Sequence, residues 1–230
     1  MSNPGMRIYK DFVRPDRKMI ELFRNAPAAN VADATSRLFA MDARISPLGK
    51  SKRLLGPALT VKSSMADNFI FHKALSLAKE GDIIVVNSCG DTNYSVCGDV
   101  MYRYAISRGV AGFIVDGCVR DLDFLQEHDF PVFAIGATPR GPYKNPVGEI
   151  NTDISCGGQV VHPGDIVLGD ADGVVVIRKD DAIAVNEKVV SIIEKEQLMT
   201  DLIEQGRWDE ESPILTMVNR EIEKLGFEIL

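Results

Sequence analysis

The sequence lacks the features of secreted and membrane-spanning chains. No apolar run approaches the roughly 18–20 residues that cross a bilayer, so we expect no membrane partner. The opening stretch MSNPGMRIYKDF has no apolar segment that directs secretion, and no signal peptide is expected. The four cysteines form no C-x-x-C pair, which argues against a zinc ribbon, a thioredoxin-like motif or a disulfide scaffold. These absences predict a cytoplasmic protein with reduced thiols.

Positive charge and histidine are also scarce. Acidic residues outnumber basic ones by 33 to 26, which gives a net charge of −7. A generally basic surface for phosphates is therefore absent, and we expect no nucleic acid as a direct partner. The three histidines are widely separated and form no H-E-x-x-H motif, so histidine-rich metal chemistry is not expected. The hydrophobic fraction of 45% is ordinary for a globular protein.

The middle of the chain alternates between helical and strand patterns. Helices and short, unbroken apolar strands follow one another over residues 66–80, 83–86, 98–108, 111–115, 120–128 and 131–135. This alternation predicts an α/β region with buried, parallel strands. An earlier strand over 55–61 contains Gly56-Pro57, which predicts an edge position or a strand start.

The flanking parts of the chain have a different character. Asp16 is an N-cap for a first helix that Pro27 stops, and a second helix is predicted over 30–39. After Gly136, strands over 159–161, 166–168 and 174–177 predict a second β layer, and helices are predicted over 180–205 and 213–225. We expect a single domain, 1–230, with an N-terminal arm (1–15), an α/β sandwich core (16–178) and C-terminal helices (180–230) that can reach a neighbouring subunit.

Gly98-Asp99 opens the helix predicted over 98–108. The first amides of a helix have no partner within it, so they can hold an anion such as a carboxylate. Asp99 is also favourably placed by the helix dipole. The alternative is that Asp99 only caps the helix, which is the usual role of such residues.

Arg120-Asp121 directly follows the apolar strand that ends near Val115. Loops at the carboxyl ends of strands are the favoured place for ligands in α/β sheets. Arg120 offers a fork of donors suited to a carboxylate or a keto oxygen. Asp121 is a hard oxygen ligand suited to Mg²⁺ or Mn²⁺. The alternative is an Arg-Asp pair that caps the helix over 120–128.

These motifs carry a resemblance to a known family over roughly residues 29–205. In order, they are Gly56-Pro57-Ala58-Leu59-Thr60-Val61, Gly81-Asp82-Ile83-Ile84-Val85-Val86, Gly98-Asp99, Arg108-Gly109-Val110-Ala111-Gly112, Val115-Asp116-Gly117-Cys118-Val119-Arg120-Asp121, Phe130-Pro131-Val132-Phe133, Pro163-Gly164-Asp165 and Gly169-Asp170-Ala171-Asp172-Gly173-Val174. The chain resembles proteins like regulator of RNase E activity A and the 4-hydroxy-4-methyl-2-oxoglutarate aldolases. The resemblance implies a swivelling β/β/α sandwich that forms homotrimers or dimers of trimers, with the active site of the aldolase branch between subunits.

The resemblance also implies a metal site. In the aldolase branch the Asp of the Arg-Asp pair binds a divalent metal, usually Mg²⁺, which corresponds here to Asp121. Asp99 would reach the metal through water. A further carboxylate would come through water from the C-terminal helix of a neighbouring subunit, with Glu196 as our choice and Glu194 as the alternative. Mn²⁺ has the same preference for oxygen ligands.

The substrate contacts follow from the same resemblance. Arg120 would steady the keto oxygen, while the turn after Gly98 would receive the pyruvyl carboxylate on the amides of Val100 and Met101. Catalysis is thus assigned to Arg120 and Asp99.

The implied reaction is a retro-aldol cleavage. A 4-hydroxy-2-oxo di- or tricarboxylic acid, such as 4-hydroxy-4-methyl-2-oxoglutarate or 4-carboxy-4-hydroxy-2-oxoadipate, is split to pyruvate and a second oxo acid. Oxaloacetate decarboxylation is an expected side activity. A metal acts as the Lewis acid, because the apolar strands contain no desolvated lysine for a Schiff base. The loop residues Arg140 and Lys144 either bind the second carboxylate of the substrate or are solvated charges.

One position departs from the aldolase branch and keeps another function open. The branch has an acidic residue three positions after the Asp of the Arg-Asp pair, whereas this chain has Phe124 with Asp123 beside it. Members that regulate the ribonuclease also lack that acid. The alternative function is therefore a non-catalytic protein regulator of a ribonuclease, and a third is an enzyme for another oxo acid.

Overall fold

The computed structural model describes residues 3–228, which fall into two units, Met1–Asn186 and Glu187–Leu230. The helices of the first unit are α1 (Arg17–Glu21), α2 (Ala28–Ala34), α3 (Phe69–Leu77), α4 (Asp99–Ser107) and α5 (Leu122–Glu127), with a 3₁₀ turn at Lys179–Asp181. A long helix, α6 (Ala182–Glu204), starts in the first unit and continues into the second. The remaining helices, α7 (Trp208–Glu211) and α8 (Pro213–Leu225), belong to the second unit.

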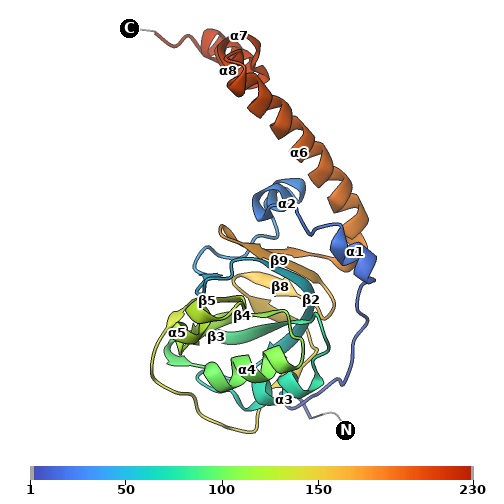
Figure 1. Ribbon diagram of the computed structural model, residues 1–230, viewed down its shortest axis with the longest axis vertical. Coiled ribbons are helices and arrows are strands. Elements are labelled where there is room, and N and C mark those ends of the chain that lie inside the picture. Colours follow the sequence, from blue (N-terminus) through green and yellow to red (C-terminus); the bar gives the residue numbers. More distant parts are fainter. Residues whose placement is uncertain (1–2, 229–230) are drawn as a thin grey trace. The chain divides into compact units, whose positions relative to one another are not determined.

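Within the described residues an eight-stranded mixed sheet organises the first unit, with strand order β1-β5-β4-β3-β2-β9-β10 and β6 beside β2 (Figure 1). Its strands are β1 (Ser46–Pro47), β2 (Leu54–Lys62), β3 (Ile83–Ser95), β4 (Gly112–Val119), β5 (Val132–Ala137), β6 (Glu149–Ile150), β9 (Ile166–Asp170) and β10 (Gly173–Ile177). The run from β2 to β5 is parallel, and the α/β prediction is confirmed. A separate hairpin joins β7 (Ile154–Cys156) and β8 (Gln159–Val161).

Strand β2 lies inside the sheet, so of the two positions predicted from Gly56-Pro57 the edge is wrong, whereas the pair does fall near the start of the strand. Its first half, Leu54 to Pro57, pairs with β9, and its pairing with β3 begins only at Ala58. Pro57 has no N–H to give, and it stands just before the parallel ladder with β3 begins. A central strand therefore tolerates this proline because the strand changes partners beside it.

Helix α2 is shorter than the helix predicted over 30–39. It ends at Ala34, and Ser36 and Arg37 follow with φ angles of 56° and 64°. These left-handed conformations cannot continue an α-helix. The Thr35 hydroxyl donates to the Val31 carbonyl, which satisfies one of the carbonyls at the helix end.

The two faces of the sheet bury separate cores. On one face lie α3, α4 and α5 (Figure 1), and they cover an aromatic cluster. Its large members are Phe71, Tyr102, Phe113, Phe124 and Phe130, which meet edge-on, tilted or stacked. On the other face, aliphatic residues of β2, β3 and β4 pack against the hairpin β7–β8 and strands β9 and β10. Since both faces are covered, the parallel strands are apolar along their length.

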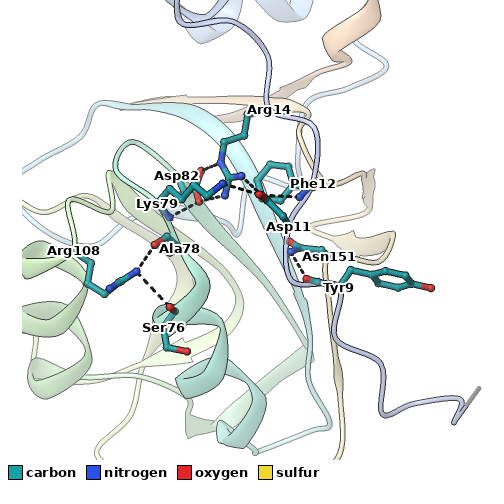
Figure 2. A network of polar contacts seen from close by, with 10 residues as sticks. All are labelled: Tyr9, Asp11, Phe12, Arg14, Ser76, Ala78, Lys79, Asp82, Arg108 and Asn151. Carbon is teal, nitrogen blue, oxygen red and sulfur yellow. Dashed lines mark hydrogen bonds and ion pairs between the residues drawn. The ribbon is translucent and has the colours of Figure 1, made fainter.

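The predicted N-terminal arm is held along the first unit by polar contacts (Figure 2). The Arg14 guanidinium donates two hydrogen bonds of 2.7 Å to the fully buried carboxylate of Asp82. Further along the arm, Arg7 pairs with the buried Glu149 at 2.5 Å. The Asn151 amide donates to the backbone carbonyl of Tyr9. Two buried carboxylates of the core thus have their cationic partners on the arm.

The second unit is helical, as the sequence predicts. Helix α8 begins after Ser212, whose hydroxyl accepts from the Leu215 amide, and ends at Gly226 with a φ of 70°. Its bounds agree with the predicted helix over 213–225. The short helix α7 was not predicted. Over residues 3–228 no helix is both long enough and apolar enough to span a membrane.

Candidate functional site

The link between β4 and α5 places Asp121 against the start of α4. Asp121 has a φ of 61° and a ψ of 49°, a left-handed conformation that is uncommon for a residue with a side chain. Its Oδ2 accepts a hydrogen bond of 2.8 Å from the Asp99 amide, the first residue of α4. A carboxylate at the positive end of a helix is electrostatically favourable. The sharp turn therefore brings the two predicted metal-binding residues together.

Gly98 makes room for this contact. A Cβ atom at Gly98 would lie 2.3 Å from Asp121 Oδ2 and 2.9 Å from Arg120 Cγ. The φ of Gly98 is −163°, which any residue can adopt, so the close approach and not the backbone conformation requires glycine here.

Arg120 presents its side chain beside the Asp121 carboxylate. Arg120 Nε lies 3.6 Å from Asp121 Oδ2, and both side chains are close to half exposed. The backbone of Arg120 is fixed on both sides, because its amide donates to the Cys97 carbonyl and its own carbonyl accepts from the Tyr102 hydroxyl. A held backbone with an exposed guanidinium is suited to meeting an anionic ligand.

Asp99 has a second cation, Arg103, one turn along α4. Arg103 Nε lies 2.5 Å from Asp99 Oδ1, and its guanidinium carbon lies 4.7 Å above the Phe124 ring. Phe124 is itself stacked on Tyr102 and on His128. At the position where the aldolase branch has an acid, this chain therefore has a buried ring that supports the arginine paired with Asp99.

The site residues predicted from the sequence line a cavity of about 260 Å³. The predicted Gly98, Asp99, Val100, Met101, Arg120 and Asp121 all contribute to its wall. Of the two loop cations considered from sequence, Lys144 lines the cavity, whereas the Arg140 guanidinium lies over the Tyr94 ring at 5.2 Å. The residues around Gly98-Asp99 and Arg120-Asp121 thus line the same cavity. The loop that contains Arg140 and Lys144 adds one further cation, Lys144.

Sequence analysis missed four polar residues of the wall, of which one is Ser95 and the other three are Asn68, His72 and Cys97. Asn68 is buried, donates to the Val96 carbonyl and has an Oδ1 atom without a hydrogen-bond partner among the described residues. Burial, and next the nearby Lys144 ammonium, lower the pKa of His72, so this ring is neutral at pH 7. Burial raises the pKa of the Cys97 thiol to about 12, which leaves no thiolate for nucleophilic chemistry. None of the four lies in a recognisable spacing, so no sequence signal marked them.

The two amides predicted to hold a carboxylate belong to the first turn of α4. The Met101 amide donates to the Gly98 carbonyl at 2.9 Å, and the Met101 side chain is buried. Val100 projects into solvent with 78% of its surface exposed. Their role toward a ligand stays a prediction.

The carboxylates predicted to bind a divalent ion are those of Asp99 and Asp121. Asp99 and Asp121 each keep about two-fifths of the side chain exposed, and their oxygens are the hard ligands that Mg²⁺ prefers. No cluster of three or more His, Cys, Asp or Glu side chains able to hold a metal occurs among residues 3–228. Glu194 and Glu196 are exposed residues of α6 in the second unit. Two carboxylates fit an ion that keeps several of its own water molecules, as Mg²⁺ usually does.

The fold and this site define a class of proteins in which an Arg-Asp pair faces the glycine-led start of a helix. The family model described as RraA-like, Aldolase/RraA, matches residues 28–176. The chain belongs to this family.

The chain is similar to the following proteins. A Halalkalibacterium halodurans protein with the provisional name 4-hydroxy-4-methyl-2-oxoglutarate aldolase is 40% identical over 160 residues, which is 70% of this chain and 76% of that protein. The structure of the RNA-processing inhibitor RraA from Thermus thermophilis has a TM-score of 0.62 at 27% identity, covering 66% of this chain and 93% of that one. An unusual member of the RNase ES inhibitor RraA family from Streptomyces coelicolor has a TM-score of 0.73 at 24% identity, covering 83% and 99%.

Proposed function

We propose that the protein is a divalent-metal-dependent lyase that cleaves a 4-hydroxy-2-oxo di- or tricarboxylic acid to pyruvate and a second oxo acid. The observation that carries this proposal is the 2.8 Å contact of the Asp121 carboxylate with the Asp99 amide, beside the half-exposed Arg120. The aldolase name of a relative with 40% identity supports the same activity. Candidate substrates are 4-hydroxy-4-methyl-2-oxoglutarate and 4-carboxy-4-hydroxy-2-oxoadipate, and oxaloacetate decarboxylation is the expected side activity.

In this proposal Asp121 holds Mg²⁺ or Mn²⁺ directly, and Asp99 holds it through water. Glu196 of a neighbouring subunit adds a third carboxylate through water, in a trimer or a dimer of trimers. When bound, the ion supplies Lewis-acid polarisation of the keto group.

The chain's own groups supply the remaining chemistry. The Arg120 guanidinium stabilises the negative charge that develops on the keto oxygen during bond cleavage. The amides of Val100 and Met101 in the first turn of α4 orient the pyruvyl carboxylate. Of these, the Met101 amide also donates to the Gly98 carbonyl. Asp99 is placed to accept the proton of the 4-hydroxyl group through a water molecule. These groups lie on one cavity wall, so a single bound substrate can meet all of them.

The test is an assay of pyruvate release from oxaloacetate and from 4-hydroxy-4-methyl-2-oxoglutarate with Mg²⁺, with and without a chelator. We expect chelator-sensitive release above the spontaneous rate, and its loss in Asp121→Asn. The matched control is Asp129→Asn, an exposed aspartate outside the cavity wall, which should leave the rate unchanged. No release above background, or full activity in Asp121→Asn, contradicts the proposal.

A second candidate function is protein-mediated regulation of a ribonuclease. Phe124 in place of the acid of the aldolase branch favours it, as does the similarity to the RNA-processing inhibitor of Thermus thermophilis. Saturable inhibition of a ribonuclease E activity that persists with chelator would support this function. With a net charge of −7 the protein would have to bind the enzyme and not its RNA.

A further inference from the structure

Asp67 is a buried carboxylate whose hydrogen bonds go to two backbone amides of different segments. It follows β2, just before α3, and is fully buried. Its Oδ1 accepts from the Phe69 amide at 2.8 Å, and its Oδ2 accepts from the Asn145 amide at 2.5 Å. Within residues 3–228 Asp67 forms no ion pair with Lys, Arg or His. The charge is therefore held by amide hydrogen bonds and by the N-terminus of α3.

The amide at Asn145 belongs to the loop that borders the candidate site. Tyr143 of this loop donates its amide to the Ala66 carbonyl and accepts from the Asn68 amide. At the other end of the loop, the Arg140 carbonyl accepts from both the amide and the hydroxyl of the buried Ser95. The residues between these anchor points are fixed on both sides.

Lys144 lies between the anchors at Tyr143 and Asn145. It lines the cavity that holds Arg120 and Asp121. Its ammonium is near enough to His72 to contribute to the lowered pKa of that ring. The hydrogen bond that the next amide, that of Asn145, donates to Asp67 thus fixes the backbone from which Lys144 extends.

A neutral side chain could cap α3 without burying a charge. A buried charge costs several kcal/mol unless its hydrogen bonds repay that cost, and hydrogen bonds to a carboxylate are roughly twice as strong as neutral ones. Here one carboxylate oxygen accepts from the Phe69 amide of α3 and the other accepts from the Asn145 amide of the loop. A carboxylate at this position therefore holds the loop as well as α3.

We propose that Asp67 is a positioning residue that holds Lys144 at the cavity wall, where the ammonium binds the distal carboxylate of a dicarboxylic 2-oxo acid. The inference rests on the proposed function for the identity of the substrate, and it makes Asp67 a determinant of the preference for diacids over monoacids. Asp67 does not touch the substrate.

The test compares two stable probes that undergo no retro-aldol cleavage, 2-oxoglutarate and 2-oxobutyrate. Their dissociation constants are measured by calorimetry in the presence of Mn²⁺. The wild-type protein should bind the diacid at least about tenfold more tightly, the ratio that corresponds to ~1.4 kcal/mol. Asp67→Asn and Lys144→Met should each lower that ratio toward one, and the double variant should lower it no further.

Hydrogen exchange supplies the second readout. Amide exchange in residues 139–147 should rise in Asp67→Asn and stay at the wild-type level in Lys144→Met, which keeps the loop anchored. The control is Asp165→Asn, because Asp165 is also buried and accepts a backbone amide, from His162, although it differs from Asp67 in its ion pair with Arg178. It should change neither the exchange of this loop nor the diacid preference.

Each outcome decides the inference separately from the proposed function. Unchanged loop exchange in Asp67→Asn, or a diacid preference that survives it, overturns the inference. Absence of any diacid preference in the wild-type protein overturns it as well. A diacid preference that depends on Asp67, in a protein that releases no pyruvate, upholds the inference and refutes the lyase.

Discussion

The amide of Asp99 donates a 2.8 Å hydrogen bond to the carboxylate of Asp121. This contact joins the start of α4 to the turn after β4, and it uses the Oδ2 atom of Asp121. Asp121 thereby acts both as a cap for α4 and as the proposed metal ligand. The capping alternatives considered from sequence are different and are wrong: the Asp99 side chain makes no cap bond to α4, and the Asp121 side chain makes none to α5.

Gly98→Ala tests the close approach of the Asp121 carboxylate to the backbone of Gly98. The added methyl group would lie 2.3 Å from Asp121 Oδ2, so the carboxylate must move. A displacement of about 1 Å at a reacting centre costs on the order of 10² in rate, and we expect a loss of that size in kcat/KM for oxaloacetate. Gly136→Ala is the control, because its nearest atom, Cys118 Sγ, lies 3.7 Å away. Equal activities of the two variants would refute this reading.

Replacement by lysine should affect kcat differently at the two arginines of the site. Arg120→Lys removes the planar fork beside Asp121, and we expect a fall in kcat of about 10²-fold or more. Arg103→Lys keeps a cation near the exposed carboxylate of Asp99, whose pairing is worth at most ~1 kcal/mol. The second variant should therefore lose less than about fivefold. Steady-state kinetics at saturating Mg²⁺ measures both, and a reversed order would contradict the assignment.

The arm contributes to stability through Arg14. Arg14→Met leaves the fully buried carboxylate of Asp82 without its cation. Removing one partner of a buried ion pair costs about 3–5 kcal/mol, and we expect a loss at the lower end because Arg14 is partly exposed. Arg17→Met removes an exposed cation 3.9 Å from Glu21 and should cost less than ~0.5 kcal/mol. Urea unfolding at pH 7 measures the difference.

Acid should weaken the attachment of the arm at Glu149. The hydrogen bond from Arg7 is the main cause that holds the pKa of Glu149 below its ordinary value of 4.5. Because the folded pKa is lower than the unfolded one, the stabilisation is present above the unfolded pKa and is lost as pH falls through the folded pKa. The difference in unfolding free energy between the wild-type protein and Glu149→Gln should therefore shrink as the pH falls from 7 to 3. A constant difference over that range would contradict the pairing.

Local pattern predicted the elements that pack in the core. Unbroken apolar runs predicted β4 and β5, and apolar residues at helical spacing predicted α4. These predictions are possible because each element buries one continuous face, which leaves a regular apolar pattern in the sequence. The strand predicted over 83–86 is only the regular beginning of β3, which continues through irregular pairing to Ser95. That extension depends on pairing with β4, and single-segment patterns do not contain it.

The site was predicted in part for a similar reason. Arg120, Asp121 and Asp99 stand out because they follow a strand end and open a helix, which are local features. The left-handed turn at Asp121 and the contribution of Asn68 depend on segments that are distant in sequence. Lys144 could not be distinguished from Arg140 by sequence, since only the anchoring of their loop decides which one reaches the cavity.

The attachment of the arm constrains when it can form during synthesis. Arg7 is made early, but its partner Glu149 follows 142 residues later. Asn151, which holds the Tyr9 carbonyl, is also 142 residues away from it. Contacts so distant in sequence close late in folding. During synthesis the arm therefore stays unattached, with its arginines solvated, until the strands that bury the matching carboxylates have emerged from the ribosome.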